Sequence, residues 1–197
     1  MRSSESTRSP PTERGIRLLL LLAGEDHPKA CTGRRLLRRG AARAVDRVVQ
    51  GARRPVVLDP HADRPLATDD EEAAVAGGLL AIDCSWNRVA ARGRLPDGSP
   101  GVGGIRRRLP LLIAGNPQHY GRVNELNTVE ALAAGVYLLG RTAQAEALLQ
   151  GFRGGGGFLD INRDRLDRYR RAANADEIRA LERSLFGGAR PPDEPVR

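Results

Sequence analysis

The amino-acid sequence predicts an α/β protein built on a parallel sheet. Short apolar runs alternate with helical patterns along most of the chain, and turn-forming or polar residues follow directly after the apolar runs. This alternation is typical of β–α–β units, in which a helix returns the chain so that the next strand lies parallel to the last. Sheets of this kind bind ligands in loops beyond the carboxyl ends of their strands. We therefore expect a binding site at that edge.

Four apolar runs are expected to form the strands. The first, residues 16–23, contains five consecutive leucines and is typical of a strand buried on both faces. It is too short to span a membrane as a helix. The other three strands are expected over Val56–Leu58, Leu79–Asp83 and Leu109–Ala114.

Apolar periodicity and helix-end residues predict the helices. Residues 32–50 carry apolar and alanine positions on one face and arginines on the other. Thr68 is expected to cap a helix that begins with acidic residues, which suit the positive end of a helix. Another helix is expected over Asn127–Leu139, capped by Asn127 or Thr128, with an acidic residue in its first turn.

The carboxyl-terminal part is expected to hold further helices over residues 142–151, 163–173 and 175–186. The glycine-rich residues 151–162 are expected to be flexible and then extended. Their four consecutive glycines lack a Lys-Ser partner and are not expected to open a helix, so the sequence argues against a phosphate-binding loop there.

Charge favours a polyanionic partner. The chain has 197 residues and a formal net charge of +8, with a sequence pI of about 10.7. Lys29 is the single lysine among 32 basic residues. An arginine-rich composition explains the choice of arginine over lysine, but it does not by itself create a positive excess. Nucleic acid is therefore the favoured partner.

Cysteine and histidine usage argues against a disulfide framework or a complete metal site. The chain has two cysteines, Cys31 and Cys84, and three histidines. His27 and Cys31 have a metal-like spacing, but His61, His119 and Cys84 are all that remains to complete such a site. A reducing cytoplasm is the simplest compartment for this composition.

Four stretches place turn formers directly after apolar runs, where loops would line a cleft. They are "EDHPKACTG" (25–33), "VVLDPHADRPLATDD" (56–70), "IDCSW" (82–86) and "LPLLIAGNPQHYGRVNELNTVEALAA" (109–134). Together and in this order they resemble the small-subunit rRNA aminocarboxypropyltransferase family of archaea and eukaryotes. That family reads "DPKKCTGKKL", "DCSWA" and "LPxLxAANPVNYGxxxxLSxxEALAA" at the matching places. The match runs from about Ile16 to Tyr169.

The resemblance implies a fold of two parts. Residues 15–55 are similar to a small α/β lobe otherwise found beside ribosome-recycling ATPases, to which metal binding has been ascribed. Residues 56–187 are similar to the SPOUT class, a parallel sheet flanked by helices with a deep trefoil knot. The Ser-, Pro- and charge-rich ends, 1–14 and 188–197, are expected to be disordered tails.

The resemblance also implies a reaction. The co-substrate is S-adenosylmethionine, and the acceptor is an N1-methylpseudouridine in small-subunit rRNA or a pre-ribosomal particle. The enzyme transfers the 3-amino-3-carboxypropyl group to N3 of that base, and methylthioadenosine leaves. Members are expected to act as cytoplasmic monomers, away from membranes.

The resemblance assigns the reaction centre to the end of the "LLAID" strand. Asp83 is expected to act as the catalytic residue, either as a general base for the N3 proton or as a group that orients the reactants. Trp86, with Leu58 and Pro60, is expected to bury the sulfonium methyl group, and a tryptophan face also attracts a cation. The backbone of Ile82 is expected to hold the ribose.

The remaining cofactor contacts are expected from three other segments. Thr32 would hydrogen-bond the methionine moiety. The residues expected to close over adenine, largely through backbone groups, are Leu111, Leu112, Asn127, Thr128 and Ala131. The residues expected to grip rRNA phosphates are Lys29, Arg34, Arg35 and Arg38, unless their helix face is simply solvated.

Three other functions stay open from the sequence. An S-adenosylmethionine-dependent RNA methyltransferase would move the methyl group, as related knotted folds usually do. A non-catalytic assembly factor would use the basic surface with a degenerate cofactor pocket. A small metal-binding module would use His27 and Cys31.

Overall fold

The computed structural model describes residues 15–22, 32–45, 54–84 and 103–187. At its centre lies a five-stranded sheet in the order β2-β1-β4-β3-β5, and all of its paired strands run parallel. The strands are β1 (Leu18–Leu22), β2 (Arg43–Ala44), β3 (Val56–Leu58), β4 (Leu79–Asp83) and β5 (Ile105–Arg107). The predicted parallel α/β sheet is therefore confirmed, and β3 and β4 have the predicted bounds.

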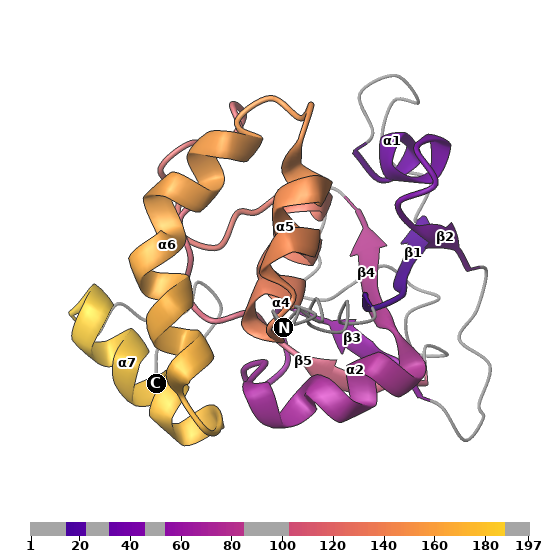
Figure 1. Cartoon of the computed structure of the whole chain (residues 1–197). Coiled ribbons are helices and arrows are strands. Elements are labelled where there is room, and N and C mark those ends of the chain that lie inside the picture. The colour runs from indigo at the N-terminus through magenta and orange to yellow at the C-terminus, as the bar shows by residue number, and fades with distance from the viewer. Residues whose placement is uncertain (1–14, 23–31, 46–53, 85–102, 188–197) are drawn as a thin grey trace, which may run out of the picture.

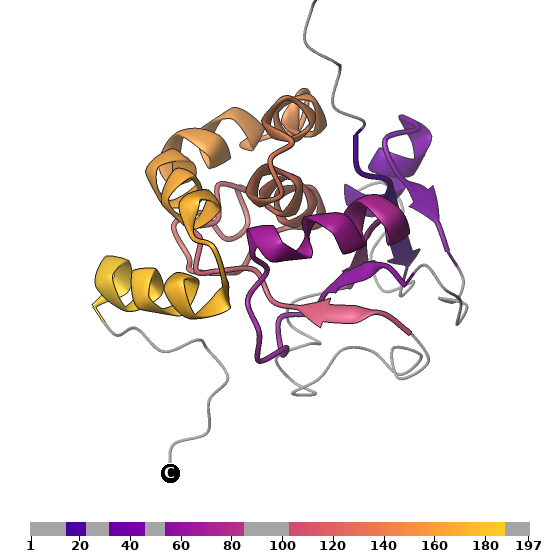
Figure 2. The same cartoon turned by 60° about the horizontal axis from the view of Figure 1, so that its bottom comes forward.

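The helices cover one face of this sheet. They are α1 (Thr32–Arg38), α2 (Glu71–Gly77) after the short 3-10 turn η1 (Thr68–Asp70), α4 (Thr128–Leu138), α5 (Thr142–Leu149), α6 (Gly155–Arg171) and α7 (Ala175–Phe186). Figures 1 and 2 show α2, α4 and α5 over the sheet, with α6 and α7 farther out. No helix in the described ranges is long and apolar enough to cross a membrane.

The main core lies between the sheet and these helices. Alternate residues of β4 point to opposite faces, so Leu79 and Ala81 join the large cluster under the helices, while Leu80 joins Val57 in a smaller cluster on the other face. Leu18 and Leu20 of β1 belong to the same large cluster as the carboxyl-terminal helices. The division into a lobe at 15–55 and a domain at 56–187 stays a prediction.

The first predicted helix is shorter than expected. Residues 32–50 were expected to form one helix, but α1 ends at Arg38 and the chain enters β2 at Arg43. The cause is Gly40, whose φ of 66° is in the left-handed region. Its N–H bonds the Leu37 carbonyl, and the next N–H bonds Leu36, which is the Schellman pattern that closes a helix. Residues 46–50 lie outside the described ranges.

Thr68 does not cap a helix. It is the first residue of η1, and its hydroxyl donates to the carbonyl of Ala172 at the end of α6, 3.0 Å away. The α-helix begins three residues later, at Glu71. The predicted cap residue therefore joins two segments that lie far apart in the sequence.

Residues 109–114 do not form the predicted strand. The edge strand is β5, just before them, and within 109–114 a single bridge joins Ile113 to Val123. Pro110 has no N–H to give to a ladder. Side chains replace the missing strand partner: Asn162 accepts from the N–H of Ile113 and donates to its carbonyl, at 2.9 and 2.7 Å.

The glycine-rich segment opens a helix rather than an extended stretch. α6 starts at Gly155, eight residues before the predicted helix, and includes the residues expected to be extended. Gly154 has a φ of 80°, and a Cβ there would lie 2.3 Å from the carbonyl oxygen of Gly115. This close packing fixes the start of α6 although glycine is a poor helix former.

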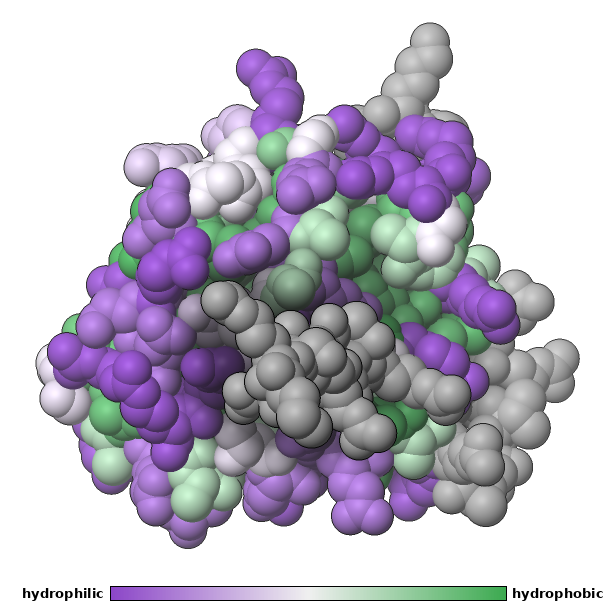
Figure 3. Space-filling view, in the orientation of Figure 1, coloured by the Kyte–Doolittle hydropathy of each residue, from purple (hydrophilic) through white to green (hydrophobic). Residues whose placement is uncertain are grey.

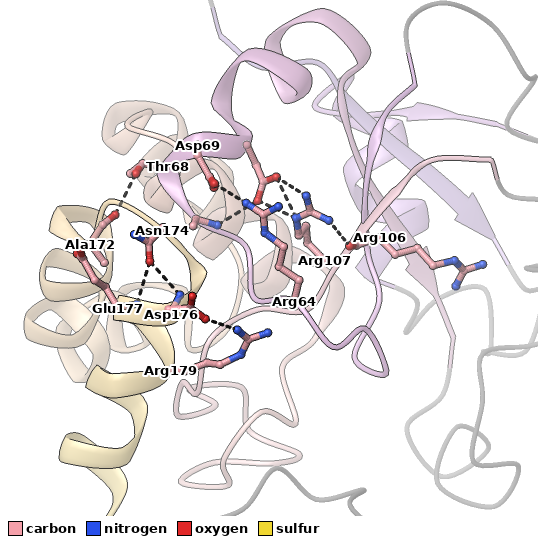
Figure 4. A network of polar contacts seen from close by, with 12 residues as sticks. Arg64, Thr68, Asp69, Arg106, Arg107, Ala172, Asn174, Asp176, Glu177 and Arg179 are labelled. Atoms are coloured by element: carbon pink, nitrogen blue, oxygen red, sulfur yellow. Dashed lines mark hydrogen bonds and ion pairs between the residues drawn. The ribbon is translucent and has the colours of Figure 1, made fainter.

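Three consecutive arginines at the end of β5 pair with three buried acids. Arg107 donates to both oxygens of Asp70 at 2.9 Å, and Arg108 donates to both oxygens of Glu182 at 2.6 and 2.8 Å. Arg106 bonds the Asp59 carboxylate. Figure 4 shows Arg107 beside the Arg64–Asp69 contact, with the Arg106 side chain pointing away from it. These pairs fasten the segment between β3 and α2 to β5 and α7.

Candidate active site

Asp83 ends the central strand β4 and lies between the first turns of two helices. Its side chain is buried, and its Oδ1 accepts a hydrogen bond from the Thr128 hydroxyl at the start of α4. On the other side, a Cβ atom at position 33 in α1 would lie 2.6 Å from Asp83 Oδ2. A glycine at position 33 therefore lets α1 approach the carboxylate. Three segments that are distant in the sequence meet at this one side chain.

The first turn of α4 is built around a second buried carboxylate. Asn127 caps the helix by accepting from the N–H of Glu130, and Glu130 accepts from the N–H of Asn127 in return, both at 2.9 Å. This reciprocal capping box confirms the predicted cap. Glu130 also accepts from the N–H of Gly115 and from the amide of Asn116. The loop after residue 114 is thereby tied to the turn that carries Thr128.

Burial raises the pKa of Glu130, although its four hydrogen bonds to N–H donors lower it in part. Its side chain is 1% exposed, so the desolvation of the charged carboxylate is the larger effect. Its donors in the described part of the chain are neutral groups. Glu130 is consequently a structural element of the site rather than part of an ion pair.

One of the predicted methyl-pocket residues lies on the strand next to the one that Asp83 ends. Leu58 ends β3 and pairs in register with Ala81 of β4, two residues before Asp83. Pro60 is exposed in the turn that follows. Ile82 lies beside Asp83 and contacts the smaller cluster on the opposite sheet face. Trp86 lies outside the described residues.

Leu111 and Leu112 are buried, and their backbone groups already bond within the protein. The N–H of Leu111 bonds Glu182 at 3.0 Å, and that of Leu112 bonds Asn124 at 2.9 Å. The Leu111 carbonyl accepts from Tyr169, and the Leu112 carbonyl accepts from Asn124 N. A contact with adenine through these N–H groups would have to replace bonds that hold this segment in place.

The remaining predicted contacts surround the same helix ends. Thr32 starts α1 next to Gly33 and is half-buried. Ala131 is half-buried in α4, one turn after Asn127. The structure therefore places the first turn of α1, Asp83 and the start of α4 together, and the cofactor contacts of Thr32 and Ala131 stay predictions.

The arginines of α1 divide into two kinds. Arg35 and Arg39 lie over the ring of Phe152, at 4.6 and 5.2 Å from its centroid. They also donate to the carbonyls of Gly151 and Gln150 respectively, at the end of α5. Figure 3 shows hydrophilic residues gathered over α1, where Arg34 and Arg38 are exposed. Lys29 lies outside the described residues.

The described residues contain no group of three or more His, Cys, Asp or Glu side chains placed to hold a metal ion. His27 and Cys31, which suggested one, lie outside the described ranges. The proposal of a metal-binding lobe therefore rests on those two residues alone.

Sequence reasoning missed Gly33 and Glu130. Both left a signal: a glycine follows Thr32 directly in "CTG", and an acid stands three residues after Asn127, which is the capping-box spacing. Asn116 also has a defined task, since its amide bonds Glu130 at 2.7 Å and the Glu125 carbonyl at 3.2 Å. These residues shape the site without being expected to touch a ligand.

Comparison with known proteins identifies the family. The family model described as "Ribosome biogenesis protein, C-terminal" matches residues 56–186. The chain is 40% identical over 177 residues to the 16S rRNA aminocarboxypropyltransferase of Methanopyrus kandleri, covering 87% of this chain and 99% of that protein. The chain belongs to the 16S rRNA aminocarboxypropyltransferase family.

Two other members of the aminocarboxypropyltransferase family also match this chain over most of its length. The protein of that name from Methanosarcina acetivorans is 37% identical over 170 residues, covering 86% of this chain and 94% of that protein. A solved structure from Vulcanisaeta distributa, described as a SAM-dependent rRNA:acp-transferase, superposes with a TM-score of 0.70 at 34% identity. It covers 88% of this chain and 99% of the other. The family predicted from the four motifs is therefore confirmed.

Proposed function

We propose that this protein transfers the 3-amino-3-carboxypropyl group of S-adenosylmethionine to N3 of an N1-methylpseudouridine in small-subunit rRNA, during ribosome biogenesis. It is a transferase of its family, and S-adenosylmethionine is the co-substrate. The observation that carries the proposal is the meeting of Gly33, Asp83 and Thr128. Each belongs to a different motif, and together they form one centre at the carboxyl edge of the sheet.

The reaction requires a choice among three carbons on the sulfonium. The N3 atom gives up its proton to solvent water and attacks the terminal methylene of the amino acid chain, and the carbon–sulfur bond breaks. Its electron pair stays on sulfur, which leaves as methylthioadenosine. Because aligned geometry decides which carbon reacts, the protein must bury the methyl group and present the chain. The family resemblance assigns this pocket to Leu58, Pro60 and Trp86, and Leu58 ends the strand next to β4.

We assign Asp83 a positioning role. One carboxylate oxygen accepts from Thr128, and the other faces the closely packed Gly33. To act as a general base, this carboxylate would have to accept the N3 proton while it also bonds Thr128. The carboxylate instead holds the first turns of α1 and α4 at a fixed separation. Thr32 and Asn127 lie on those turns, so their placement around the methionine and adenine parts depends on Asp83.

The finer features implied by the family accompany this proposal. They are a SPOUT-like domain with a deep trefoil knot, action as a monomer, and a cytoplasmic location. Sedimentation of the purified protein with S-adenosylmethionine would test the monomer, because a dimer would give about twice the mass.

Two labelled cofactors test the reaction directly. The protein is incubated with rRNA or pre-ribosomal particles that carry N1-methylpseudouridine, and with S-adenosylmethionine labelled on the methyl or on the carboxyl group. We expect carboxyl label in the RNA and no methyl label. Methyl label alone would identify a methyltransferase. RNA binding with neither label would identify a non-catalytic assembly factor.

Three variants test the role of Asp83. Asp83→Ala is expected to lose transfer by at least 100-fold, since both helix turns lose their shared partner, whereas Asp83→Asn should keep most activity because an amide oxygen still accepts from Thr128. The surface change Asp160→Ala, on the exposed side of α6, is the matched control. Equal losses for the Ala and Asn variants, with an unchanged cofactor affinity, would make Asp83 a general base instead.

A further inference from the structure

One aromatic side chain of the described fold faces solvent. Tyr120 is 69% exposed, whereas the other two tyrosines, Tyr137 and Tyr169, are 3% and 0% exposed. Aromatic residues make up only 4% of the chain, and their usual place is the core. Most of the Tyr120 ring is therefore outside the core and available to a ligand.

Tyr120 lies on a loop that the backbone closes tightly. The segment between β5 and α4 turns back on itself, with Ala114 N bonding the Arg122 carbonyl at 2.8 Å and Gly121 N bonding the Ala114 carbonyl at 2.9 Å. Gly121 has a φ of 81°, which allows the chain to reverse there. Tyr120 thus stands directly before the bond that closes a defined turn.

This loop is fixed to the reaction centre through its base. The buried Glu130 accepts from Gly115 N at 2.9 Å and from the Asn116 amide at 2.7 Å, and Asn116 in turn accepts from His119 N at 3.0 Å. Glu130 lies in the same helical turn as Thr128, which bonds Asp83. The loop that carries Tyr120 therefore has a set position relative to the proposed site of transfer.

The neighbours of Tyr120 suit a negatively charged, base-bearing ligand. Arg122 is exposed, with 63% of its side chain in solvent, and the His119 ring is partly exposed. Glu125 holds both of them, bonding Arg122 at 3.1 Å and the His119 ring. An exposed aromatic ring and an exposed guanidinium on one loop, as Tyr120 and Arg122 are, can stack an unpaired base and contact its phosphate.

We propose that Tyr120 stacks on an unpaired base of the RNA substrate. The proposal rests on the rRNA substrate argued above and adds a contact outside the cofactor site. RNA that presents a base to Asp83 has to unstack it from its neighbours. The ring of Tyr120, on the loop tied to α4, would hold the RNA strand in that unstacked form. Stacking is tolerant of base identity, so Tyr120 supplies affinity and placement rather than sequence reading.

The test measures binding of a synthetic rRNA hairpin that carries N1-methylpseudouridine in its loop. Tyr120→Ala is expected to weaken binding by roughly ten-fold or more, as loss of a base–aromatic stack does. Tyr120→Phe keeps the ring and should stay within about two-fold of the parent. The matched control is Val75→Ala, which changes the other exposed large apolar side chain, on α2. Cofactor affinity should be the same in all four proteins.

Salt dependence separates stacking from charge. Because Tyr120 carries no charge, Tyr120→Ala should lower the line of log affinity against log salt without changing its slope. Unchanged affinity for the hairpin would overturn the proposal. So would a loss of transfer confined to pre-ribosomal particles, which would indicate a protein contact. The labelled-cofactor assay of the parent protein is independent of these results, because hairpin binding can depend on Tyr120 even if no label is transferred.

Discussion

Two arginine-rich segments of this protein look alike in the sequence and differ in the structure. In residues 106–108, each arginine pairs with its own buried acid. In residues 34–39, two of the arginines lie over Phe152 and bond backbone carbonyls, while Arg38 is exposed on the outer face of α1. A count of basic residues treats both runs as candidate RNA surfaces. In the second run, Arg34 and Arg38 are exposed, and their contact with RNA phosphates stays a prediction.

The two runs differ because buried carboxylates pair with the arginines of residues 106–108. Asp59, Asp70 and Glu182 are 4–7% exposed; the first two lie between β3 and α2, and the third lies in α7. A buried carboxylate is costly unless a cation and further hydrogen bonds accompany it. The arginines of β5 therefore serve folding. The count of 32 basic residues therefore overstates the cations available to RNA, whereas the net charge of +8 does not, because the paired acids are already counted in it.

Arg108→Met should have the largest effect on stability. It would leave the Glu182 carboxylate buried beside the Leu111 N–H without its cation, and breaking a buried pair costs about 3–5 kcal/mol. Urea unfolding followed by circular dichroism measures the loss. Adding Glu182→Gln should recover part of it, since an amide oxygen still accepts from Leu111. A loss below about 1 kcal/mol would place this pair with ordinary surface charges.

Phe152→Leu should have a moderate effect, because it removes the ring beneath Arg35 and Arg39. Each cation–π contact at an exposed site contributes about 0.5–1 kcal/mol, so we expect a loss of about 1–2 kcal/mol. Cofactor affinity should also fall, since α1 carries Thr32; equilibrium dialysis measures this. Phe186→Leu is the control, because that ring faces a single arginine and lies at the end of α7. Equal losses of stability and of cofactor affinity in the two variants would mean that the contact of Phe152 with Arg35 and Arg39 does not support the site.

The sequence predicted elements whose cause is local. β3 and β4 have their predicted bounds because apolar runs and the turn residues after them stand next to each other in the chain. The start of α4 follows from Asn127 and Glu130, three residues apart. Periodicity and capping depend on neighbours in the sequence, so a single chain reveals them.

Elements held by distant partners could not be predicted in this way. The segment 109–114 reads as a strand, but Asn124, Asn162 and Glu182 supply its hydrogen bonds, up to 71 residues away. The start of α6 similarly depends on the contact between Gly154 and Gly115. No local pattern records such contacts, and they override intrinsic propensity.

The site was predicted through the family resemblance more than through its chemistry. The family, enzyme class and co-substrate are confirmed, and the Thr128 hydroxyl bonds Asp83, but the roles assigned to the site residues stay predictions. The predicted adenine contacts of Leu111 and Leu112 are harder to make, because their N–H groups already bond Glu182 and Asn124. What the motifs did not reveal is why Gly33 must be small, which depends on a carboxylate 50 residues away.

Glu130 differs from the three buried acids that pair with residues 106–108, because neutral N–H donors rather than an arginine bond its carboxylate. Burial raises its pKa above the ordinary 4.5. Between 4.5 and the raised value, the folded state keeps a proton that the unfolded state has lost, so stability should fall as pH rises through that window and level off above it. The measurement is the difference in unfolding free energy between the parent and Glu130→Gln across that range. A difference that rises with pH would mean that the N–H donors outweigh burial.

Arg38→Ala should have the smallest effect on folding and a distinct effect on RNA. Arg38 is exposed in the last turn of α1, so its loss should change stability by no more than about 0.5 kcal/mol. If it contacts a phosphate, the slope of log affinity against log salt should shrink by about 0.7–0.9. Arg168→Ala, which removes an exposed arginine paired with Asp164 on α6, is the matched control and should leave the slope unchanged. Equal slopes for Arg38→Ala and the parent would make the outer face of α1 a solvated surface, and the RNA would then have to be held by the loop that carries Tyr120.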